Sequence, residues 1–492
     1  MAAWLRERTD VQLLAAAATA VTGLSLSSQR VLPGDLYAAL PGSRAHGATY
    51  SDAARDAGAV AVLTDPAGRD AAAATGLPVL VVGHPRSVLG ALSARLYGDP
   101  AAGLTLMAIT GTQGKTTTSR LLEGGLEQAG IRAAVIGTIG TRIAGHDVPS
   151  SLTTPEAPDL HALFAVMREQ DVRGCVMEVS SHALVMGRVA GTTFDVAAFL
   201  NLGRDHLDFH ADLDEYFAAK ASLFTPERAR LGLTNVDDQH GRRLLEVAGI
   251  PMRTFSPSGA EADWRAVDVR LQADGSTFTV LGPAGERIEA GVQLAGGYNV
   301  ANALCAIALA GEAGFDPALV AGGIARAGGV PGRLERVDAG QPFLAIVDYA
   351  HKPDAVEAAV SALRPVTTGR LILVIGAGGD RDTGKRPVMG EIGGRLADVL
   401  VVTDDNPRTE DPAAIRAALL QGARGGTAQV HEVSGRREAI RRAVAMATPG
   451  DTVLVAGKGH ETGQEVAGVV HPFDDRDEVR AAVRDLLEEG QR

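Results

Sequence analysis

The sequence predicts an α/β protein whose strands form parallel sheets covered by helices. Short apolar runs alternate with segments of helical periodicity, and each run ends in a polar or glycine-rich motif. Continuous apolar strands are typical of parallel sheets that are buried on both faces. In such sheets ligands bind at the carboxyl ends of the strands, which is where these motifs lie. The length of 492 residues is enough for two to four domains.

Composition narrows the class further. The chain is 46% hydrophobic but only 4% aromatic, and its formal net charge is −12. This balance is typical of a folded globular protein, and unlike a disordered chain or a general nucleic-acid binder. Two cysteines, Cys175 and Cys305, are too few for a disulfide framework or a zinc knuckle, which favours a reducing cytoplasm.

No apolar run reaches the length of a membrane span. The stretch from Val11 to Leu24 follows Arg6 and Arg8 and loosely resembles a signal peptide, but Glu7 and Asp10 interrupt its positive region. Because the stretch is rich in alanine, we interpret it as a helix. We therefore expect a cytoplasmic protein with no membrane or nucleic-acid partner, and we expect it to be a monomer.

Residues 1–102 form the first predicted unit. A turn-rich loop over residues 28–35 precedes short strands at Ala59–Leu63 and Pro78–Val82, with helical stretches between them. Asp99-Pro100 is a turn signal and predicts a boundary to the next unit.

The central region carries the strongest motifs. Its predicted parallel strands are Leu104–Thr110, Ala133–Ile136, Gly174–Met177 and Val196–Leu200. Residues 264–294 instead alternate apolar and polar side chains around Asp274-Gly275, which predicts an antiparallel meander. A helix over Asn299–Ala313 follows the meander.

A third region repeats the parallel-sheet pattern from Gly332-Arg333 onward. Its predicted strands are Leu344–Val347, Arg370–Ile375, Val399–Thr403 and Thr452–Val455. Each strand is followed directly by a motif rich in charged residues or glycine, so ligand contacts are expected at this sheet edge as well.

The motif Gly111–Thr117 predicts a phosphate-binding loop. Glycines allow backbone N–H groups to close around phosphate oxygens, and the dipole of the following helix favours an anion. Lys115 is expected to reach the outer phosphates, and the Thr116 hydroxyl to bind Mg²⁺. Ile109 stands where the general motif has glycine, so this is a shorter variant of the loop. The alternative is a glycine-rich turn with an exposed lysine.

Glu178 and His206 each follow a strand of the same predicted sheet. A carboxylate and an imidazole at neighbouring strand ends are suited to complete Mg²⁺ shells around a nucleotide. Taken alone, either residue is more often structural, and the phosphate loop at the same edge is what favours the metal-binding interpretation.

Lysine is rare in this chain and therefore informative. Of the 47 basic residues only five are lysines, and the sequence uses arginine elsewhere. Lys220 lies in a helical stretch with Asp214 and Glu215, where a solvated salt bridge is the ordinary interpretation. Only a lysine amine, however, loses its proton and reacts with CO₂ to form an anionic carbamate that binds metal.

The motifs of the third region are suited to a nucleotide and an amino acid. Asp348 and His351 could contact a ribose or base. Arg381 and Arg408 are suited to carboxylates because the guanidinium group binds them through two hydrogen bonds. Glu461, with the backbone around Gly457, is suited to an ammonium group. Together they predict a pocket for a zwitterionic amino acid with an additional charged end.

These motifs resemble those of the Mur ligases of peptidoglycan synthesis, in their order and spacing and over nearly the whole chain. The matching segments are Gly111–Thr117, Glu178–His182, Asn201–Asp208, Gly297–Asn299, Gly332-Arg333, Asp348–His351 and Asp405–Arg408. The resemblance implies three domains: a UDP-binding domain over residues 1–102, a phosphate-loop ATPase domain with a parallel sheet over 103–333, and a Rossmann-like amino-acid-binding domain over 334–492.

The resemblance also implies ATP-dependent amide formation with Mg²⁺. The γ-phosphoryl group would move to the D-glutamyl carboxylate of UDP-N-acetylmuramoyl-L-alanyl-D-glutamate, and an amino acid would attack the acyl phosphate. A carboxylate is a poor electrophile until its oxygen becomes a phosphate leaving group, and Mg²⁺ with Lys115 would neutralise the developing charge.

Family positions transfer onto this chain residue by residue. For ATP they are Gly111, Thr112, Gln113, Gly114, Lys115, Thr116, Thr117, Asn299, Arg333, Asp348 and His351. One Mg²⁺ is expected at Thr116 and Glu178, and a second at His206 and carbamylated Lys220. The UDP-muramoyl substrate is expected at Ser28, Thr153, Thr154, Ser180 and Arg188, and the amino acid at Arg381, Asp405, Asn406, Pro407, Arg408, Gly457 and Glu461. Lys115, Lys220 and His206 are the expected catalytic residues.

Arg408 favours diaminopimelate as the amino acid, since relatives that add lysine lack this arginine. L-lysine, glutamate in a folate-type ligation, and a phosphate-loop ATPase that switches a partner are the alternatives. The chain also departs from its relatives. Gln113 replaces the commoner Asn, Met186 replaces Gln, and Ser27-Ser28-Gln29 replaces Asp-Ser-Arg near the uridine end. Lys352, Lys385 and Lys458 receive no role at this stage.

Overall fold

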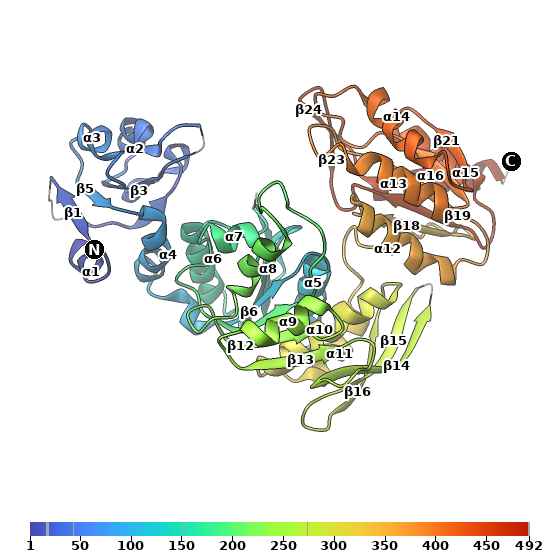
Figure 1. Cartoon of the computed structure of the whole chain (residues 1–492), viewed down its shortest axis with the longest axis horizontal. Coiled ribbons are helices and arrows are strands. Elements are labelled where there is room, and N and C mark those ends of the chain that lie inside the picture. Colours follow the sequence, from blue (N-terminus) through green and yellow to red (C-terminus); the bar gives the residue numbers. More distant parts are fainter. Residues whose placement is uncertain (16–18, 43, 151, 273, 491–492) are drawn as a thin grey trace. The chain divides into compact units, whose positions relative to one another are not determined.

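A computed structural model describes the chain except residues 16–18, 43, 151, 273 and 491–492 (Figure 1). The chain divides into two compact units. The first contains residues 1–256 and 305–317, and the second contains residues 257–304 and 318–492. The α/β class predicted from the sequence is confirmed, whereas the domain boundaries near residues 102 and 333 stay a prediction.

The first unit begins with a five-stranded sheet. Its strands are β1 (Val11–Leu14), β2 (Gly23–Ser25), β3 (Asp35–Ala39), β4 (Ala61–Thr64) and β5 (Val79–Val82), in the order β1-β5-β4-β3-β2. β1 runs antiparallel to β5 and the other pairs are parallel. Its helices are α1 (Ala2–Arg6), α2 (Ser51–Asp56), α3 (Arg69–Ala73) and α4 (Pro85–Leu96).

The helix expected from Val11 to Leu24 is wrong. Val11–Leu14 pairs with the edge of the buried strand β5, and Gly23–Ser25 pairs with β3. Residues 16–18, which carry much of the alanine that suggested a helix, lie outside the described residues. Pairing with an apolar sheet edge is a tertiary interaction that outweighs local helix propensity.

The same unit contains a larger parallel sheet. Its strands are β6 (Thr105–Thr110), β7 (Ala133–Gly137), β8 (Gly140–Ile143), β9 (His146–Val148), β10 (Gly174–Glu178), β11 (Phe194–Phe199), β12 (Ala229–Asn235) and β13 (Met252–Ser256). They follow the order β13-β12-β11-β6-β10-β7-β8-β9. The pairs β7–β8 and β8–β9 are antiparallel, and the pairs among β6, β7, β10, β11, β12 and β13 are parallel. Its helices are α5 (Lys115–Gln128), α6 (Ala157–Glu169), α7 (Ser181–Val185), α8 (Leu213–Ala221) and α9 (Gln239–Val247).

Strand β6 lies in the middle of this sheet, between β10 and β11. The three strands are almost completely buried, which explains why their sequences are continuous apolar runs. The loops that follow β6, β10 and β11 therefore meet at one sheet edge, and these loops carry the phosphate-loop motif, Glu178 and His206.

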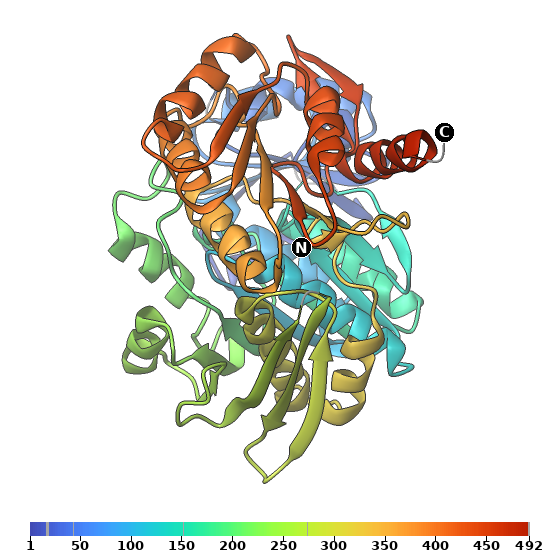
Figure 2. The same ribbon diagram turned by 90° about the vertical axis from the view of Figure 1, so that its right-hand side faces the viewer.

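The second unit begins with the antiparallel meander that the sequence predicts. Its strands are β14 (Trp264–Gln272), β15 (Gly275–Leu281) and β16 (Arg287–Val292), seen as olive-green ribbons in Figure 2. α10 (Gly297–Glu312) and α11 (Pro317–Arg326) follow, and α10 corresponds to the predicted helix Asn299–Ala313. The division between the two units falls within α10.

The rest of the second unit is a six-stranded sheet. Its strands are β17 (Glu335–Arg336), β18 (Leu344–Asp348), β19 (Leu371–Ile375), β20 (Val399–Val402), β21 (Gln429–Glu432) and β22 (Thr452–Ala456), in the order β17-β18-β22-β19-β20-β21. All pairs are parallel except β17 with β18. A hairpin of β23 (Gly463–Val466) and β24 (Val469–Pro472) follows β22.

Helices cover both faces of this sheet. α12 (Pro353–Leu363), α13 (Lys385–Leu396) and α14 (Pro412–Ala423) pack on one face, while α15 (Arg436–Met446) and α16 (Asp475–Gly490) pack on the other. Side chains alternate accordingly: Leu454 faces the first layer, and Val453 and Val455 face the second. Among the described helices, none has the length and apolar character needed to span a membrane.

Candidate active site

The Gly111–Thr117 loop joins β6 to α5, which confirms the predicted strand–loop–helix context. Gly114 caps α5 in the left-handed region, with a φ of +86°, where glycine is favoured. Gly111 packs so closely that a Cβ there would lie 3.0 Å from the Cβ of Leu200. The loop can therefore hold its sharp path only with glycine at these two positions.

The Asn201 side chain shapes this loop from the neighbouring strand end. Its Oδ1 accepts hydrogen bonds from the backbone N–H groups of Thr112 (3.2 Å) and Gln113 (2.9 Å), and its Nδ2 donates to the Gln113 carbonyl. Sequence reasoning assigned no role to Asn201, although it opens the motif after β11. Tyr216 was also missed, and its hydroxyl lies 3.2 Å from Thr112 Oγ1.

Two lysines converge on one carbonyl oxygen of the loop. Lys115 Nζ donates to Gly111 O at 2.8 Å and to Thr112 O at 3.0 Å, and Lys220 Nζ also donates to Gly111 O at 2.8 Å. The two ammonium groups cannot be farther apart than the sum of the two 2.8 Å distances. Both side chains therefore place positive charge at the carbonyl of Gly111, beside the loop that is predicted to hold phosphate.

Lys220 comes from α8 and is only 1% exposed. Its ammonium lies 4.5 Å from the centre of the Tyr216 ring. The solvated salt bridge that is ordinary for a helical lysine is therefore not what this residue forms. Burial also raises the pKa of the Tyr216 hydroxyl, which keeps this neighbour protonated.

Glu178 ends β10 and is 1% exposed. Its Oε2 accepts from the hydroxyls of Thr116 (3.1 Å) and Thr138 (3.0 Å), and its Oε1 accepts from the Thr138 backbone N–H (2.9 Å). Hydroxyl and carboxylate oxygens are the ligands that Mg²⁺ prefers, so the Thr116–Glu178 pair fits this ion. No three His, Cys, Asp or Glu side chains gather as a metal site in the described part of the chain.

His206 follows β11 in the left-handed region, with a φ of +53°, and its Nε2 lies 3.3 Å from Asp205 Oδ2. Its ring centre is 6.0 Å from that of Tyr216, the same ring that Lys220 contacts. His206 and Lys220, which are predicted to bind the same metal ion, thus both lie close to the Tyr216 ring. The ring of His182 lies 4.8 Å from His206, and burial lowers the pKa of His182.

Three residues predicted for the UDP-muramoyl substrate surround Glu178. Thr153 Oγ1 lies 3.2 Å from Thr138 Oγ1, Thr154 Oγ1 donates to the Glu178 carbonyl at 2.8 Å, and the Ser180 N–H donates to Thr154 Oγ1 at 3.3 Å. A substrate held by these threonines would therefore be next to the proposed Mg²⁺ ligands.

Arg188 and Ser28 lie farther along the same unit. Arg188 donates through Nε to Glu156 at 2.9 Å and through a terminal nitrogen to the Thr154 carbonyl at 3.3 Å. Ser28 begins a short 3₁₀ helix after β2, and Arg30 in that turn pairs with Asp159 of α6. Arg188 is thus connected to the Thr154 cluster, whereas Ser28 lies in the short 3₁₀ helix that follows β2 of the first sheet.

The second unit holds the remaining residues predicted for ATP. Asp348 Oδ2 accepts from the Leu334 N–H (2.7 Å), its Oδ1 accepts from the Ala350 N–H (2.8 Å), and burial raises its pKa. The Arg333 guanidinium lies 4.7 Å from the centre of the Tyr349 ring. Asp348 and Arg333 are therefore fixed at the end of β18.

His351 and Asn299 have protein partners of their own. His351 Nδ1 lies 2.8 Å from the Tyr349 carbonyl, and burial lowers the pKa of the ring to about 4, so it is neutral at pH 7. Asn299 is 2% exposed, and its amide bonds to Ala295 O and Asn302 Nδ2. Lys385 donates to the His351 carbonyl at 2.9 Å, a contact that the sequence did not predict.

The residues predicted for the amino acid follow β19, β20 and β22, whose carboxyl ends are neighbours in the sheet. Arg381 is exposed after β19. Arg408 donates through Nε to Glu465 (3.1 Å) and through a terminal nitrogen to the Gly379 carbonyl (2.7 Å). Gly457 packs so tightly that a Cβ would lie 2.5 Å from Asp405 Oδ2.

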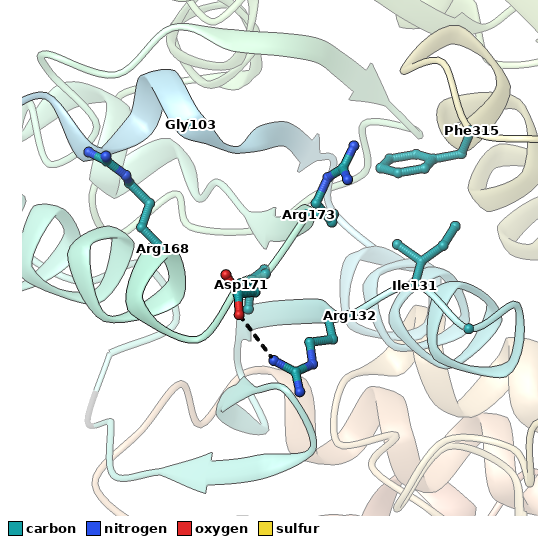
Figure 3. Close-up of a pocket in the computed structure, with 9 residues that line it drawn as sticks. Gly103, Ile131, Arg132, Arg168, Asp171, Arg173 and Phe315 are labelled. Carbon is teal, nitrogen blue, oxygen red and sulfur yellow. Dashed lines mark ion pairs between the residues drawn. The ribbon is translucent and has the colours of Figure 1, made fainter.

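A surface cavity of about 660 Å³ lies elsewhere in the first unit (Figure 3). Arg132, Arg168, Arg173 and Phe315 are among its lining residues, and Arg132 pairs with Asp171 at 3.7 Å. Its walls precede β6, β7 and β10, so the cavity lies at the amino ends of the strands. The phosphate loop and Glu178 lie at the carboxyl ends, so this cavity is not the candidate active site.

A glycine loop bearing a lysine, with a hydroxyl–carboxylate pair at its base, defines the class of phosphate-loop nucleotide-binding enzymes. Comparison with protein-family models identifies the family within this class. The chain matches the Mur ligase family catalytic domain over residues 20–97, the Mur ligase middle domain over 109–310, and the Mur ligase glutamate ligase domain over 332–459.

Individual relatives agree with these matches. The chain is 58% identical to a UDP-N-acetylmuramoyl-L-alanyl-D-glutamate–2,6-diaminopimelate ligase of Streptomyces avermitilis, over 94% of this chain and 92% of the relative. It is 48% identical to a UDP-N-acetylmuramyl-tripeptide synthetase of Leifsonia xyli, again over 94% and 92%. A solved diaminopimelate ligase structure superposes with a TM-score of 0.69 at 34% identity, over 94% of this chain and 95% of the other. The chain belongs to the Mur ligase family.

Proposed function

We propose that this protein is an ATP-dependent ligase that joins diaminopimelate to UDP-N-acetylmuramoyl-L-alanyl-D-glutamate in peptidoglycan synthesis. The observation that carries the proposal is Arg408, in the loop after β20, whose Nε donates to Glu465, while Asn406 two residues earlier donates to Glu461. A guanidinium next to a carboxylate is suited to the distal carboxylate and ammonium of diaminopimelate, whereas lysine has no carboxylate at that end. The relatives named above support the same substrate pair.

The reaction follows from the chemistry of a carboxylate. Transfer of the γ-phosphoryl group of ATP to the D-glutamyl carboxylate releases ADP and gives an acyl phosphate. The amine of diaminopimelate then attacks the acyl carbon, an amide bond forms, and phosphate leaves as the amine loses its proton. Lys115 and the amide groups of the Gly111–Thr117 loop are the groups that would stabilise the phosphoryl charge.

Thr116 and Glu178 would hold one Mg²⁺, and His206 with Lys220 would hold a second. Bound Mg²⁺ would neutralise negative charge on the phosphates. The two lysines on the Gly111 carbonyl support the proposal that Lys220 reacts with CO₂, since the reaction would place an anionic carbamate next to the Lys115 ammonium.

The remaining assignments follow the family positions. Thr153, Thr154, Ser180 and Arg188 would contact the muramoyl dipeptide, and Ser28 the uridine end. Asn299, Arg333, Asp348 and His351 would contact ATP. We assign UDP binding to residues 1–102, ATP binding to 103–333 and amino-acid binding to 334–492, in a cytoplasmic monomer.

Phosphate release from the purified protein tests the proposal. A ligase requires ATP, Mg²⁺, the UDP-linked dipeptide and diaminopimelate together, and omission of either acceptor should reduce release to a small residual rate. Equal release in the absence of both acceptors would instead indicate a phosphate-loop ATPase that acts on another partner.

A further inference from the structure

Lys458 is a buried lysine that none of the proposed roles uses. It lies in the turn that follows β22, and its side chain is 0% exposed. Its ammonium donates to Asn406 Oδ1 at 2.9 Å and to Glu461 Oε2 at 2.9 Å. One side chain therefore connects the motif after β20 to the motif after β22. An ammonium is buried at this depth only when such partners compensate the lost hydration.

The three side chains form a closed set of contacts. Asn406 Nδ2 donates to Glu461 Oε2 at 3.0 Å, so each member bonds to the other two. Asn406 Oδ1 also accepts from the Glu465 N–H at 3.0 Å. Both the oxygen and the nitrogen of the Asn406 amide thus have protein partners. Asn406 therefore positions Glu461 in addition to any contact with a ligand.

The hydrogen bonds to the Glu461 carboxylate involve one of its two oxygens. In the described part of the chain, both side-chain hydrogen bonds to its carboxylate end on Oε2. The Glu461 side chain is 34% exposed, so the carboxylate is accessible from the site side. Lys458 and Asn406 therefore orient the group so that Oε1 is the oxygen presented to an incoming ammonium.

The surrounding charges leave this pocket suited to a cation. Arg436 is fully buried and pairs with Asp475 at 2.6 Å. Asp405 Oδ2 is buried and has no hydrogen-bond partner. Arg436 is thus compensated by Asp475, while Glu461 keeps a partly exposed carboxylate next to Lys458, which suits it to a substrate ammonium.

We propose that Lys458 is a positioning residue that orients Glu461 to bind the distal ammonium of the amino-acid substrate. The proposal rests on the proposed function, because it takes the Asn406–Glu461–Arg408 region as the amino-acid site. Lys458 does not contact the substrate, and it acts through Glu461. Lysine suits this position because its ammonium is a compact donor, whereas arginine carries a larger planar guanidinium.

The test compares diaminopimelate with 2-aminopimelate, which keeps the reacting amine and both carboxylates but lacks the distal amine. kcat/KM for each amino acid, and KM for ATP, are measured in the wild-type protein, Lys458→Met and Lys458→Gln. Lys458→Gln retains a hydrogen-bond donor, so the test does not depend on the folding of one variant. Arg441→Met, which removes a half-exposed cation of α15, is the matched control.

The wild-type protein should prefer diaminopimelate over 2-aminopimelate, and Lys458→Met should reduce this preference by about tenfold, the scale of one charge-assisted hydrogen bond. KM for ATP should stay within about twofold in both Lys458 variants and in Arg441→Met. A Lys458→Met enzyme that keeps the wild-type preference, or that loses activity equally toward both amino acids and ATP, would overturn the proposal. Absence of diaminopimelate turnover in the wild-type protein would instead contradict the proposed function.

Discussion

Replacement of Lys220 tests the role of a buried lysine in the phosphate-loop site. The ammonium is 1% exposed, donates to Gly111 O at 2.8 Å and lies over Tyr216. Lys220→Met keeps most of the buried volume but removes the charge and the hydrogen bond. A hydrogen bond from a charged group contributes about 1.5–3 kcal/mol to stability, so removal of the unmodified ammonium should lower the free energy of unfolding by about 2 kcal/mol. Lys220→Ala also removes buried volume, so its free energy of unfolding should fall further.

The effect on activity should be larger than the effect on stability. Loss of one hydrogen-bond donor that stabilises charge in a transition state typically lowers kcat by about 10²–10³, and a group that binds Mg²⁺ at the phosphates should matter at least as much. Phosphate release with all substrates should therefore fall by at least about a hundredfold in Lys220→Ala and Lys220→Met. Lys220→Arg should fail as well, because a guanidinium cannot form a carbamate. A short carboxylic acid should partly restore Lys220→Ala, whereas bicarbonate alone should not.

The chemical state of Lys220 can be read independently of turnover. ¹³C NMR of the protein in ¹³C-bicarbonate should show a carbamate resonance that is absent from Lys220→Met, with urea denaturation of both proteins as the stability control. Near-normal phosphate release by folded Lys220→Ala would refute the reasoning, because the lysine would then serve only the structure of the loop.

Three other substitutions test other parts of the site. Arg408→Ala should raise KM for diaminopimelate by about 10- to 100-fold, the scale of hydrogen bonds between charged groups, with KM for ATP nearly unchanged. Glu178→Gln should raise the Mg²⁺ concentration for half-maximal phosphate release by roughly tenfold, and Mn²⁺ binding followed by electron paramagnetic resonance should weaken in parallel. Burial lowers the pKa of His351 from 6.5 to about 4. Between these pH values the ring is protonated in the unfolded chain but neutral in the folded protein. The stability contributed by the neutral ring is therefore lost as pH falls from 6.5 toward 4. Urea unfolding of His351→Gln should accordingly depend less on pH in that range than unfolding of the wild-type protein.

For each of these three substitutions, a specific result would contradict the prediction. An unchanged KM for diaminopimelate would remove Arg408 from the amino-acid site, and unaltered Mn²⁺ binding would exclude Glu178 as a metal ligand. Identical slopes of stability against pH for His351→Gln and the wild-type protein would show that the ring titrates normally in the folded state.

Local sequence predicted the parallel strands well because burial on both faces leaves a signal in every residue. The boundaries of β6, β10 and β11 agree with prediction to within two residues, and so does the start of the meander. The strand β1 was missed because its partner, β5, is more than sixty residues away along the chain. Nothing in the local sequence distinguishes an apolar edge strand from a short helix.

The same limit applies to the candidate site. The residue types at the strand ends indicated phosphate and Mg²⁺ chemistry, because glycine, lysine, threonine and glutamate have few other reasons to occur there together. The contact of Lys220 with Gly111 joins residues 109 positions apart, and the contact of Lys458 with Asn406 joins residues 52 positions apart. The rarity of lysine indicated that these positions were unusual, but only the fold shows which groups they contact.

A competition between amino acids tests the central claim most directly. The protein is incubated with ATP, Mg²⁺, UDP-N-acetylmuramoyl-L-alanyl-D-glutamate and equimolar diaminopimelate and L-lysine, and the UDP-linked products are resolved by mass spectrometry. The Arg408 site predicts that nearly all product carries diaminopimelate. Product that carries lysine in equal or greater amount would contradict the assignment.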